Sequence, residues 1–463
     1  MRARNWTRLA AACLLFAAPP LAAQDRLLLA NIGPENRYLL IEDGAIATTG
    51  DAADMPPVEG SVQILDAQGL FAHPGLIDMH VHVWGEAELS GYLAYGVTTV
   101  RNLSGMPFHL RMAEEIAAGE LAGPRLYTSG PILNSPGPNA QINHQMVLTE
   151  EEGRAAVRAQ HEAGYDRIKV YSNLNADAWS GVLAEAQALG MAITGHTPEG
   201  ERLEGIPQVR PFQIPHANLL DAGFETFEHT ETIYFHGLRD SWDAEAARIL
   251  ARDIAASGTP VTPTLVAHRN LVHMAESDGA FAQREGVDWL NPVLQALEAE
   301  VTAFWSAQDP ANERERAGHY AEFTRIMQRE GVLLVAGSDA GIFVNVPGRS
   351  LVDELELLVE AGLTSGEALA SATGNAAKVL GEEERLGCLD EGCAADIVLY
   401  PCDPQLDIAC LRQPALVIAA GRPHAVDELA AKAVQHDVEQ IGTDLLEGMA
   451  AQGTPLDPAM LGM

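Results

Sequence analysis

Short apolar runs alternate with helical stretches from about residue 73 to residue 385, and this repeat constrains the fold more than any other feature. Strands of a parallel sheet are buried on both faces, and each needs a crossover helix before the next one begins. We expect strands at 76–81, 98–102, 125–129, 167–171, 191–196, 226–229, 260–265 and 332–338. Eight parallel strands joined by helices predict an α/β fold, a (β/α)8 barrel of the TIM type.

The two ends of the chain carry a different pattern, in which apolar runs are separated by turn residues. Residues 24–72 read as hairpins, and residues 386–424 return to short strands after the last barrel helix. We expect the two ends to join in one small β-sandwich beside the barrel of residues 73–385. Residues 425–463 are expected to form an acidic, helical tail.

The first residues are typical of an export signal. Arg2, Arg4 and Arg8 precede a short apolar run that ends at Pro19. This run is about half as long as a bilayer span, which favours a cleaved signal peptide over a membrane anchor. We therefore expect a signal peptide at residues 1–23, a periplasmic or secreted protein, and no membrane insertion.

Four cysteines remain after this segment, and all lie late in the chain, at Cys388, Cys393, Cys402 and Cys410. An even number of cysteines in an exported chain favours disulfides. The spacing allows two local loops, 388 with 393 and 402 with 410, although three pairings are open. A four-cysteine zinc site is the alternative.

The charge of the chain limits its partners. There are 29 basic and 64 acidic residues, which give a formal net charge of −35. Such a surface repels phosphate backbones and anionic lipids, so we expect no nucleic-acid partner. A small-molecule substrate is expected, and a homo-oligomer stays open.

Metal-type side chains recur at the ends of the expected strands. His80 and His82 are two residues apart in one strand, so both imidazoles lie on the same face and can reach one ion. Lys169 lies within an apolar strand, where a charge is costly unless it is paired or modified. Further residues of this kind end or follow later strands: His196, His229 and Asp339. Barrel enzymes build their active sites at this end of the strands.

With these residues in place, the sequence resembles the amidohydrolase superfamily of metal-dependent hydrolases. The closer likeness is to its imidazolonepropionase-like branch, which includes binuclear Xaa-Pro dipeptidases and acyl-amino-acid hydrolases. The matching segments are 74–82, 96–101, 168–169, 195–196, 228–229 and 337–341. The resemblance covers about residues 27 to 422 and implies the same barrel with its β-sandwich.

The resemblance also implies a site with two divalent metal ions, expected to be zinc. His80, His82 and Asp339 would bind the first ion, and His196 and His229 the second. Lys169 would be carboxylated by CO2 and would bridge both ions. A hydroxide between the ions would attack the substrate carbonyl, while Asp339 acts as general acid and base.

Three further positions are candidates for contact with the substrate. His144 is the nearest histidine that could contact the substrate carbonyl, because the glycine–histidine cluster expected after the third strand is absent. Tyr234 could donate a hydrogen bond to the substrate or to an oxyanion, or it could be a packing tyrosine. Arg269, next to His268, could pair with a substrate carboxylate, or it could form a surface salt bridge.

These features predict a hydrolase that cleaves the C–N amide bond of a small peptide-like or N-acyl amino acid substrate. Glu199 supports an alternative, because it lies three residues after His196. Deaminase-type relatives use a glutamate at this spacing, so a mononuclear deaminase or a cyclic-amide ring-opening hydrolase is the second hypothesis. A catalytically inactive binding module is the third.

Overall fold

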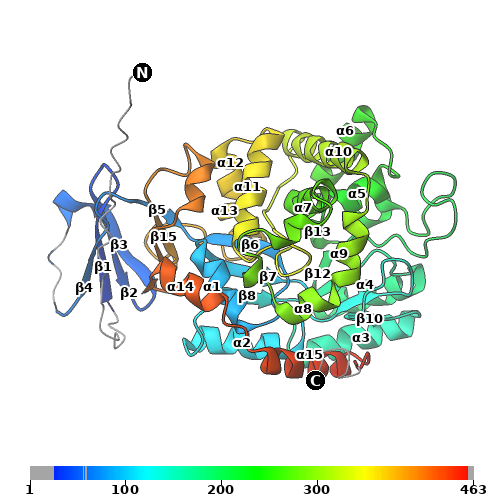
Figure 1. Ribbon diagram of the computed structural model, residues 1–463, viewed down its shortest axis with the longest axis horizontal. Coiled ribbons are helices and arrows are strands. Elements are labelled where there is room, and N and C mark those ends of the chain that lie inside the picture. Colours follow the sequence, from blue (N-terminus) through cyan, green and yellow to red (C-terminus); the bar gives the residue numbers. More distant parts are fainter. Residues whose placement is uncertain (1–25, 56, 58–59, 457–463) are drawn as a thin grey trace, which may run out of the picture.

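The computed structural model describes residues 26–55, 57 and 60–456 (Figure 1). The signal peptide expected at residues 1–23 lies outside the described residues. The chain forms a barrel ringed by helices, with a smaller β-sandwich at one side.

Parallel strands form the wall of the barrel. Hydrogen bonds join β6 to β7 and β7 to β8, and they join β11 to β12, β12 to β13 and β13 to β14. The strands are β6 (Leu76–Val81), β7 (Val97–Asn102), β8 (Arg125–Thr128), β11 (Arg167–Val170), β12 (Ala192–Gly195), β13 (Phe224–Glu228) and β14 (Val261–Thr262). The amide of Gly130, just after β8, donates to the carbonyl of Arg167 and connects the two sets.

The barrel closes through the segment expected to be the eighth strand, and here the prediction of a regular strand at 332–338 is wrong. Only single bridges form, from Leu334 to Val261 of β14 and from Ala340 to Val81 of β6. The segment is squeezed between its neighbours, since a Cβ on Gly337 would lie 2.5 Å from Thr262 and 2.8 Å from His80. The closed parallel barrel itself is confirmed.

The strand expected at 260–265 is also shorter than predicted, since β14 covers only Val261–Thr262. Thr264 adopts a positive φ of 51°, and a helix begins at the next residue.

Two short strands were not predicted, β9 (Ile132–Asn134) and β10 (His144–Met146), and they extend the sheet next to β11. They matter for function because β10 begins with His144.

Helices surround the barrel wall and cover its outer face (Figure 1). They are α1 (Glu86–Ala94), α2 (Pro107–Ala118), α3 (Glu150–Ala163), α4 (Ala176–Leu189), α5 (Thr230–Gly237), α6 (Ala244–Ser257), α7 (Leu265–Glu276), α8 (Pro292–Leu297), α9 (Ala299–Ser306), α10 (Pro310–Arg329), α11 (Arg349–Ala361), α12 (Ser365–Ser371) and α13 (Gly374–Val379). Local sequence sets their ends. In α3, for example, the Thr149 hydroxyl accepts the amide of Glu152, and Gly164 ends the helix in the left-handed conformation.

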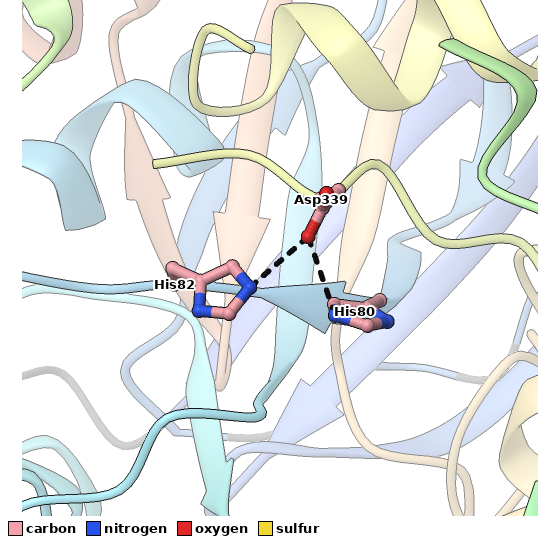
Figure 2. A group of neighbouring side chains, drawn as sticks. All are labelled: His80, His82 and Asp339. Carbon is pink, nitrogen blue, oxygen red and sulfur yellow. Dashed lines mark hydrogen bonds and ion pairs between the residues drawn. The ribbon is translucent and has the colours of Figure 1, made fainter. Parts of the chain in front are cut away.

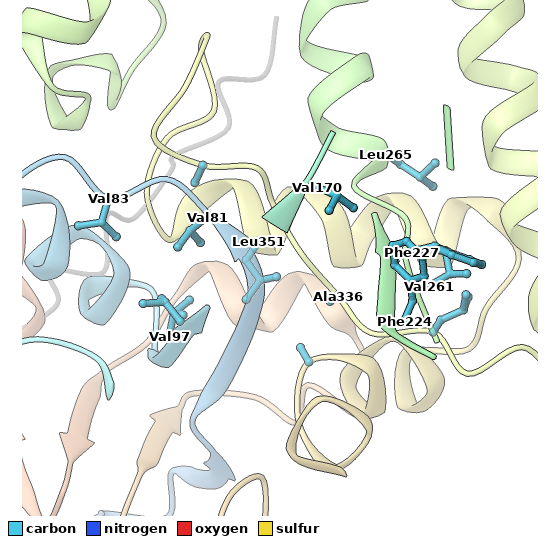
Figure 3. Packing of buried hydrophobic residues seen from close by; sticks show 14 of the residues in the cluster. Val81, Val83, Val97, Val170, Phe224, Phe227, Val261, Leu265, Ala336 and Leu351 are labelled. Carbon is cyan, nitrogen blue, oxygen red and sulfur yellow. The ribbon is translucent and has the colours of Figure 1, made fainter. Parts of the chain in front are cut away.

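The main hydrophobic core lies between the barrel wall and these helices (Figure 3). Val97 and Val170 of the wall and Leu351 of α11 are fully buried within it. Val81, which lies between His80 and His82, and Phe227, two residues before His229, belong to the same core. Packing of these neighbours therefore fixes the strand ends that carry the site.

The predicted β-sandwich of both chain ends is confirmed. One sheet has the order β3-β2-β1-β4 and the other β17-β16-β15-β5. The strands are β1 (Arg26–Ile32), β2 (Arg37–Glu42), β3 (Ala45–Asp51), β4 (Gln63–Asp66), β5 (Phe71–Pro74), β15 (Ile397–Tyr400), β16 (Leu416–Ala419) and β17 (Arg422–His424). Leu29 and Ile41 of the first sheet share a buried core with Ile397 and Leu399 of the second.

The four late cysteines form two disulfides, Cys388–Cys393 and Cys402–Cys410. This is the local pairing among the three that the sequence left open. Because each of these sulfur atoms is bonded to its partner in a disulfide, none is free to bind zinc, and the alternative of a four-cysteine zinc site is excluded.

The segment expected to be a tail contains two helices, α14 (Val426–Ala433) and α15 (Val438–Ala451). The first packs on α1, and the second packs on α2 and α8. Leu429, Ile441 and Leu445 are buried by this packing, so the segment belongs to the outer layer of the barrel. Within the described part of the chain, no helix has the length and apolar character needed to cross a bilayer.

Candidate metal centre

Two histidines and one carboxylate meet at the carboxyl end of the barrel (Figure 2). His80 ends β6 together with Val81, His82 follows directly, and Asp339 comes from the closing segment. Oδ1 of Asp339 lies 3.0 Å from Nε2 of His82 and 3.3 Å from Nε2 of His80. All three side chains are buried, and one ligand atom of each lies within 4.8 Å of the others. Imidazole and carboxylate ligands at this spacing form a metal-binding group.

The backbone at this group is held in unusual conformations. Asp339 and His229 have φ values of 54° and 66°, which residues other than glycine seldom adopt. The amide of Asp339 donates to the carbonyl of His80 at 2.8 Å, which anchors the turn. Such outliers cluster at functional sites, where the surrounding structure maintains them.

The charge state of Asp339 follows from its neighbours. Burial alone would raise the pKa of this carboxyl, but the hydrogen bond to His82 and the positive potential of His80 and His229 hold the pKa well below its usual range. Asp339 is therefore an ionised carboxylate, which suits both a metal ligand and a proton acceptor.

Lys169 lies beside this group in the interior of the barrel. Its Nζ is 3.4 Å from Nε2 of His80, and only 1% of the residue is exposed. Burial lowers the pKa of the amine to about 8, although the carboxylates of Glu228 and Asp339 oppose the shift. About a tenth of the amine is thus neutral at pH 7, and the neutral amine is the form that reacts with CO2.

His196 and His229 complete a compact set of rings. The ring centre of His229 lies 4.5 Å from that of His80 and 4.5 Å from that of His196. In both histidines Nδ1 is engaged, with the Thr264 hydroxyl for His229 and the Ser172 hydroxyl for His196. Nε2 of each ring is the nitrogen left for a metal. The structure therefore brings all six sequence-predicted ligands to one place.

His144 lies near these ligands, at the start of β10. Nδ1 of its ring accepts the amide of Gln141 and contacts the Asn134 side chain, at 3.3 and 3.1 Å. Its Nε2 is buried, and no described residue bonds to it. Burial, followed by the positive potential of Lys169 and His82, lowers the pKa of His144 to about 3. The ring is therefore neutral, with its proton on Nε2.

Tyr234 packs among other aromatic side chains, which is one of the two roles that the sequence leaves open. Its ring packs on Trp242, His319 and Tyr320, and its hydroxyl lies 3.5 Å from Nδ1 of His319. These neighbours belong to α10 and to the segment before α6, whereas the metal-binding residues cluster around His80. A role for Tyr234 in contacting the substrate or an oxyanion has no contact in its favour.

His268 and Arg269 also have partners of their own. Nδ1 of His268 lies 3.6 Å from the carboxylate of Glu231, and Nε2 lies 3.5 Å from that of Glu313. Arg269 extends toward Glu360 on α11, at 3.8 Å. His268 is thus linked to a residue two positions after His229, whereas Arg269 points between outer helices.

Glu199, the basis of the mononuclear alternative, is fully buried. Both of its carboxylate oxygens accept hydrogen bonds from Arg202, at 2.7 and 2.9 Å. Burial raises the pKa of this carboxyl, although the hydrogen bonds and the charge of Arg202 oppose the shift.

Sequence reasoning did not assign roles to Tyr171, Arg101 and Glu228. The ring of Tyr171 stacks on His196 at 3.7 Å and also contacts His144. Glu228 accepts a hydrogen bond from His80, and Arg101 pairs with Glu228. The signal was present, because charged residues inside apolar strand runs must find partners in the interior.

A buried metal-binding group at the carboxyl end of a (β/α)8 barrel, with a β-sandwich built from both chain ends, defines a metal-dependent hydrolase. Similarity to a known protein family supports this class. The chain belongs to the Amidohydrolase family, whose model matches residues 71–423, and it is a hydrolase that acts on carbon–nitrogen bonds.

Individual relatives are more distant. An uncharacterised protein of Mycobacterium tuberculosis is 27% identical over 414 residues, covering 83% of this chain and 91% of the relative. An imidazolonepropionase of Sphingopyxis alaskensis is 24% identical over 376 residues, covering 78% and 85%. A solved Xaa-Pro dipeptidase with bound methionine has a similar fold, with a TM-score of 0.62 and 20% identity, covering 86% of this chain and 100% of that one.

Proposed function

We propose that this protein is a binuclear amidohydrolase that cleaves the C–N bond of a small peptide-like or N-acyl amino acid substrate. One observation carries the proposal, namely that Nζ of Lys169 lies 3.4 Å from Nε2 of His80 while its positive charge also acts on His196 and His229. The group of His80, His82 and Asp339 would hold one ion, and the pair His196 and His229 the other. A carboxylated lysine at this position would supply the oxygens for two ions, which we expect to be zinc.

Bound divalent ions would lower the pKa of a water molecule toward neutrality and polarise the substrate carbonyl. The residues of the chain do the rest. Asp339 is ionised and can take a proton from the attacking water, then hand it to the leaving amine. His144 can donate a hydrogen bond from its Nε2–H group to the carbonyl oxygen as negative charge develops there.

The substrate class is supported by the comparisons. The solved relative with bound methionine is a Xaa-Pro dipeptidase, and the sequence relative from Sphingopyxis alaskensis is an imidazolonepropionase. We favour the peptide-like substrate, because Arg202 engages both carboxylate oxygens of Glu199, the residue on which the mononuclear alternative depends.

The proposal is tested with the purified full-length protein loaded with Zn²⁺. A panel of dipeptides and N-acyl amino acids is incubated with it, and the products are identified by mass spectrometry. We expect cleavage of amide bonds with about two zinc ions per chain. A protein that binds one ion and releases ammonia from a heterocyclic amine, with no amide cleavage, would contradict the proposal.

His144 provides a prediction of its own. Replacing His144 by alanine removes the Nε2 donor, so we expect kcat to fall by about 10²- to 10³-fold, with the metal content unchanged. Steady-state kinetics and metal analysis check this result. Tyr234→Phe is the matched control, because its hydroxyl faces His319 and its loss should leave kcat near the wild-type value. An equal effect of both variants would argue against a direct role for His144.

We also propose that the protein is exported to the periplasm or secreted. The basic residues Arg2, Arg4 and Arg8 and the apolar run after them support this location, as do the two disulfides. Amino-terminal sequencing of the protein from fractionated cells tests it, with a start near residue 24 expected.

A further inference from the structure

We propose that Glu228 is a positioning residue that sets the metal affinity of the centre by fixing His80, and that Arg101 holds it in place. The inference rests on the metal centre described above and adds to it two interior residues that touch neither metal nor substrate.

Glu228 joins His80 to a buried network. Its Oε2 lies 2.7 Å from Nδ1 of His80. Its Oε1 accepts hydrogen bonds from Nη2 of Arg101 at 2.7 Å and from the Thr194 hydroxyl at 2.8 Å. The hydroxyl of Thr226 donates to the same oxygen. Glu228 and Arg101 are fully buried, so these contacts replace all of the water that the carboxylate would otherwise bind.

This network decides which nitrogen of His80 faces the metal. An ionised carboxylate can only accept, so Nδ1 of His80 carries the proton and donates it to Glu228. The lone pair is then on Nε2, which points toward Asp339 and Lys169. A carboxylate behind a metal-binding histidine fixes the ring and raises its basicity as a ligand.

Arg101 keeps the carboxylate charged and correctly oriented. Its Nε donates to the carbonyl of Met79, the residue before His80, at 2.8 Å. It also pairs with Glu228 and with Glu225, each at 2.7 Å, and Nη2 donates to the Thr226 hydroxyl at 2.9 Å. The guanidinium therefore holds both the backbone next to His80 and the carboxylate behind the ring of His80.

Glu225 offers a matched comparison on the same strand. It accepts from Nη1 of Arg101 at the same distance as Glu228 accepts from Nη2, and it also lies 3.5 Å from Arg167. Its described partners are thus arginines, whereas Glu228 also reaches His80. Removing the charge of either glutamate leaves Arg101 with one carboxylate partner. Only the change at Glu228 alters a contact of His80, a proposed metal ligand.

The experiment compares Glu228→Gln with Glu225→Gln in the metal-free, full-length protein. Affinity for Zn²⁺ is measured by competition with a chromophoric chelator, and stability of the metal-free forms by thermal unfolding. We expect the affinity of Glu228→Gln to be about 10- to 100-fold weaker than that of the wild type. We expect the affinity of Glu225→Gln to stay close to that of the wild type, even where both variants unfold at lower temperature.

Unchanged Zn²⁺ affinity in Glu228→Gln would overturn the inference while leaving the metal centre intact. An equal loss in both variants would also overturn it, because the effect would then belong to the charge balance of Arg101. A wild-type protein that binds no Zn²⁺ would overturn the metal centre and the inference together. If Glu228→Gln fails to fold, Thr194→Val serves instead, since it keeps every charge and removes one hydrogen bond to Oε1. Weaker Zn²⁺ binding supports the inference, and unchanged binding overturns it.

Discussion

Replacing Asp339 by asparagine is expected to lower kcat by about 10²- to 10⁴-fold, the range attributed to general acid–base catalysis, while the protein keeps its fold. Asparagine has nearly the same shape and can still accept a hydrogen bond from His82, which lies 3.0 Å from Oδ1 in the wild type. It cannot take a proton from water, and it is a weaker ligand because it carries no charge.

The result is measured by steady-state kinetics on Zn²⁺-loaded protein, with circular dichroism as the check on folding. Asp78→Asn is not a suitable control, because Asp78 bonds to Ser338 next to the site. Asp403→Asn lies in the sandwich-side segment after β15 and serves better. Near wild-type turnover in Asp339→Asn would mean that another group moves the proton.

Replacing Lys169 by alanine is expected to remove activity together with at least one of the two proposed ions. Lys169 is 1% exposed and its Nζ lies 3.4 Å from Nε2 of His80, so alanine would remove the only group at this position that could be carboxylated to bridge two ions. Metal content per chain is the primary measurement, and turnover is the second. A variant that retains the wild-type metal content would contradict carboxylation of this lysine.

A pH dependence follows from the same residue. The pKa of Lys169 is lowered to about 8, and the neutral amine is the form that takes up CO2. The neutral fraction rises as the pH rises through this value, so carboxylation is expected to be faster at pH 9 than at pH 7 at a fixed concentration of dissolved CO2. Recovery of activity by metal-free protein, after addition of Zn²⁺ with and without bicarbonate, measures this. Recovery that is independent of both pH and bicarbonate would contradict it.

The sequence was sufficient to predict the fold and the group of His80, His82 and Asp339 for a specific reason. Barrel strands are buried on both faces, so His80, Lys169 and His196 stand out in apolar runs as polar residues that need partners. The strand expected at 76–81 has the same bounds in the structure. The β-sandwich was predictable from turn residues, because each hairpin needs them.

Other features depend on packing that a single sequence does not encode. The closing segment has the composition of a strand but forms only bridges, because Gly337 lies tightly against Thr262 and His80. Tyr234 and Arg269 lie in α5 and α7, the helices that follow β13 and β14. Successive residues of a helix point in directions about 100° apart, so a shift of one residue decides whether a side chain faces the site or the outer helices. Hence Tyr234 packs on His319 and Arg269 extends to Glu360.

The irregular closure of the barrel has a consequence for how the molecule responds to metal. On each side the closing segment is held by an isolated bridge and a few backbone hydrogen bonds rather than by a regular ladder. Asp339 belongs to this closing segment, while His80 lies in β6 and His82 directly follows it. An ion held by all three residues would link the closing segment to β6, so metal binding should stabilise the closed barrel as well as supply the chemistry.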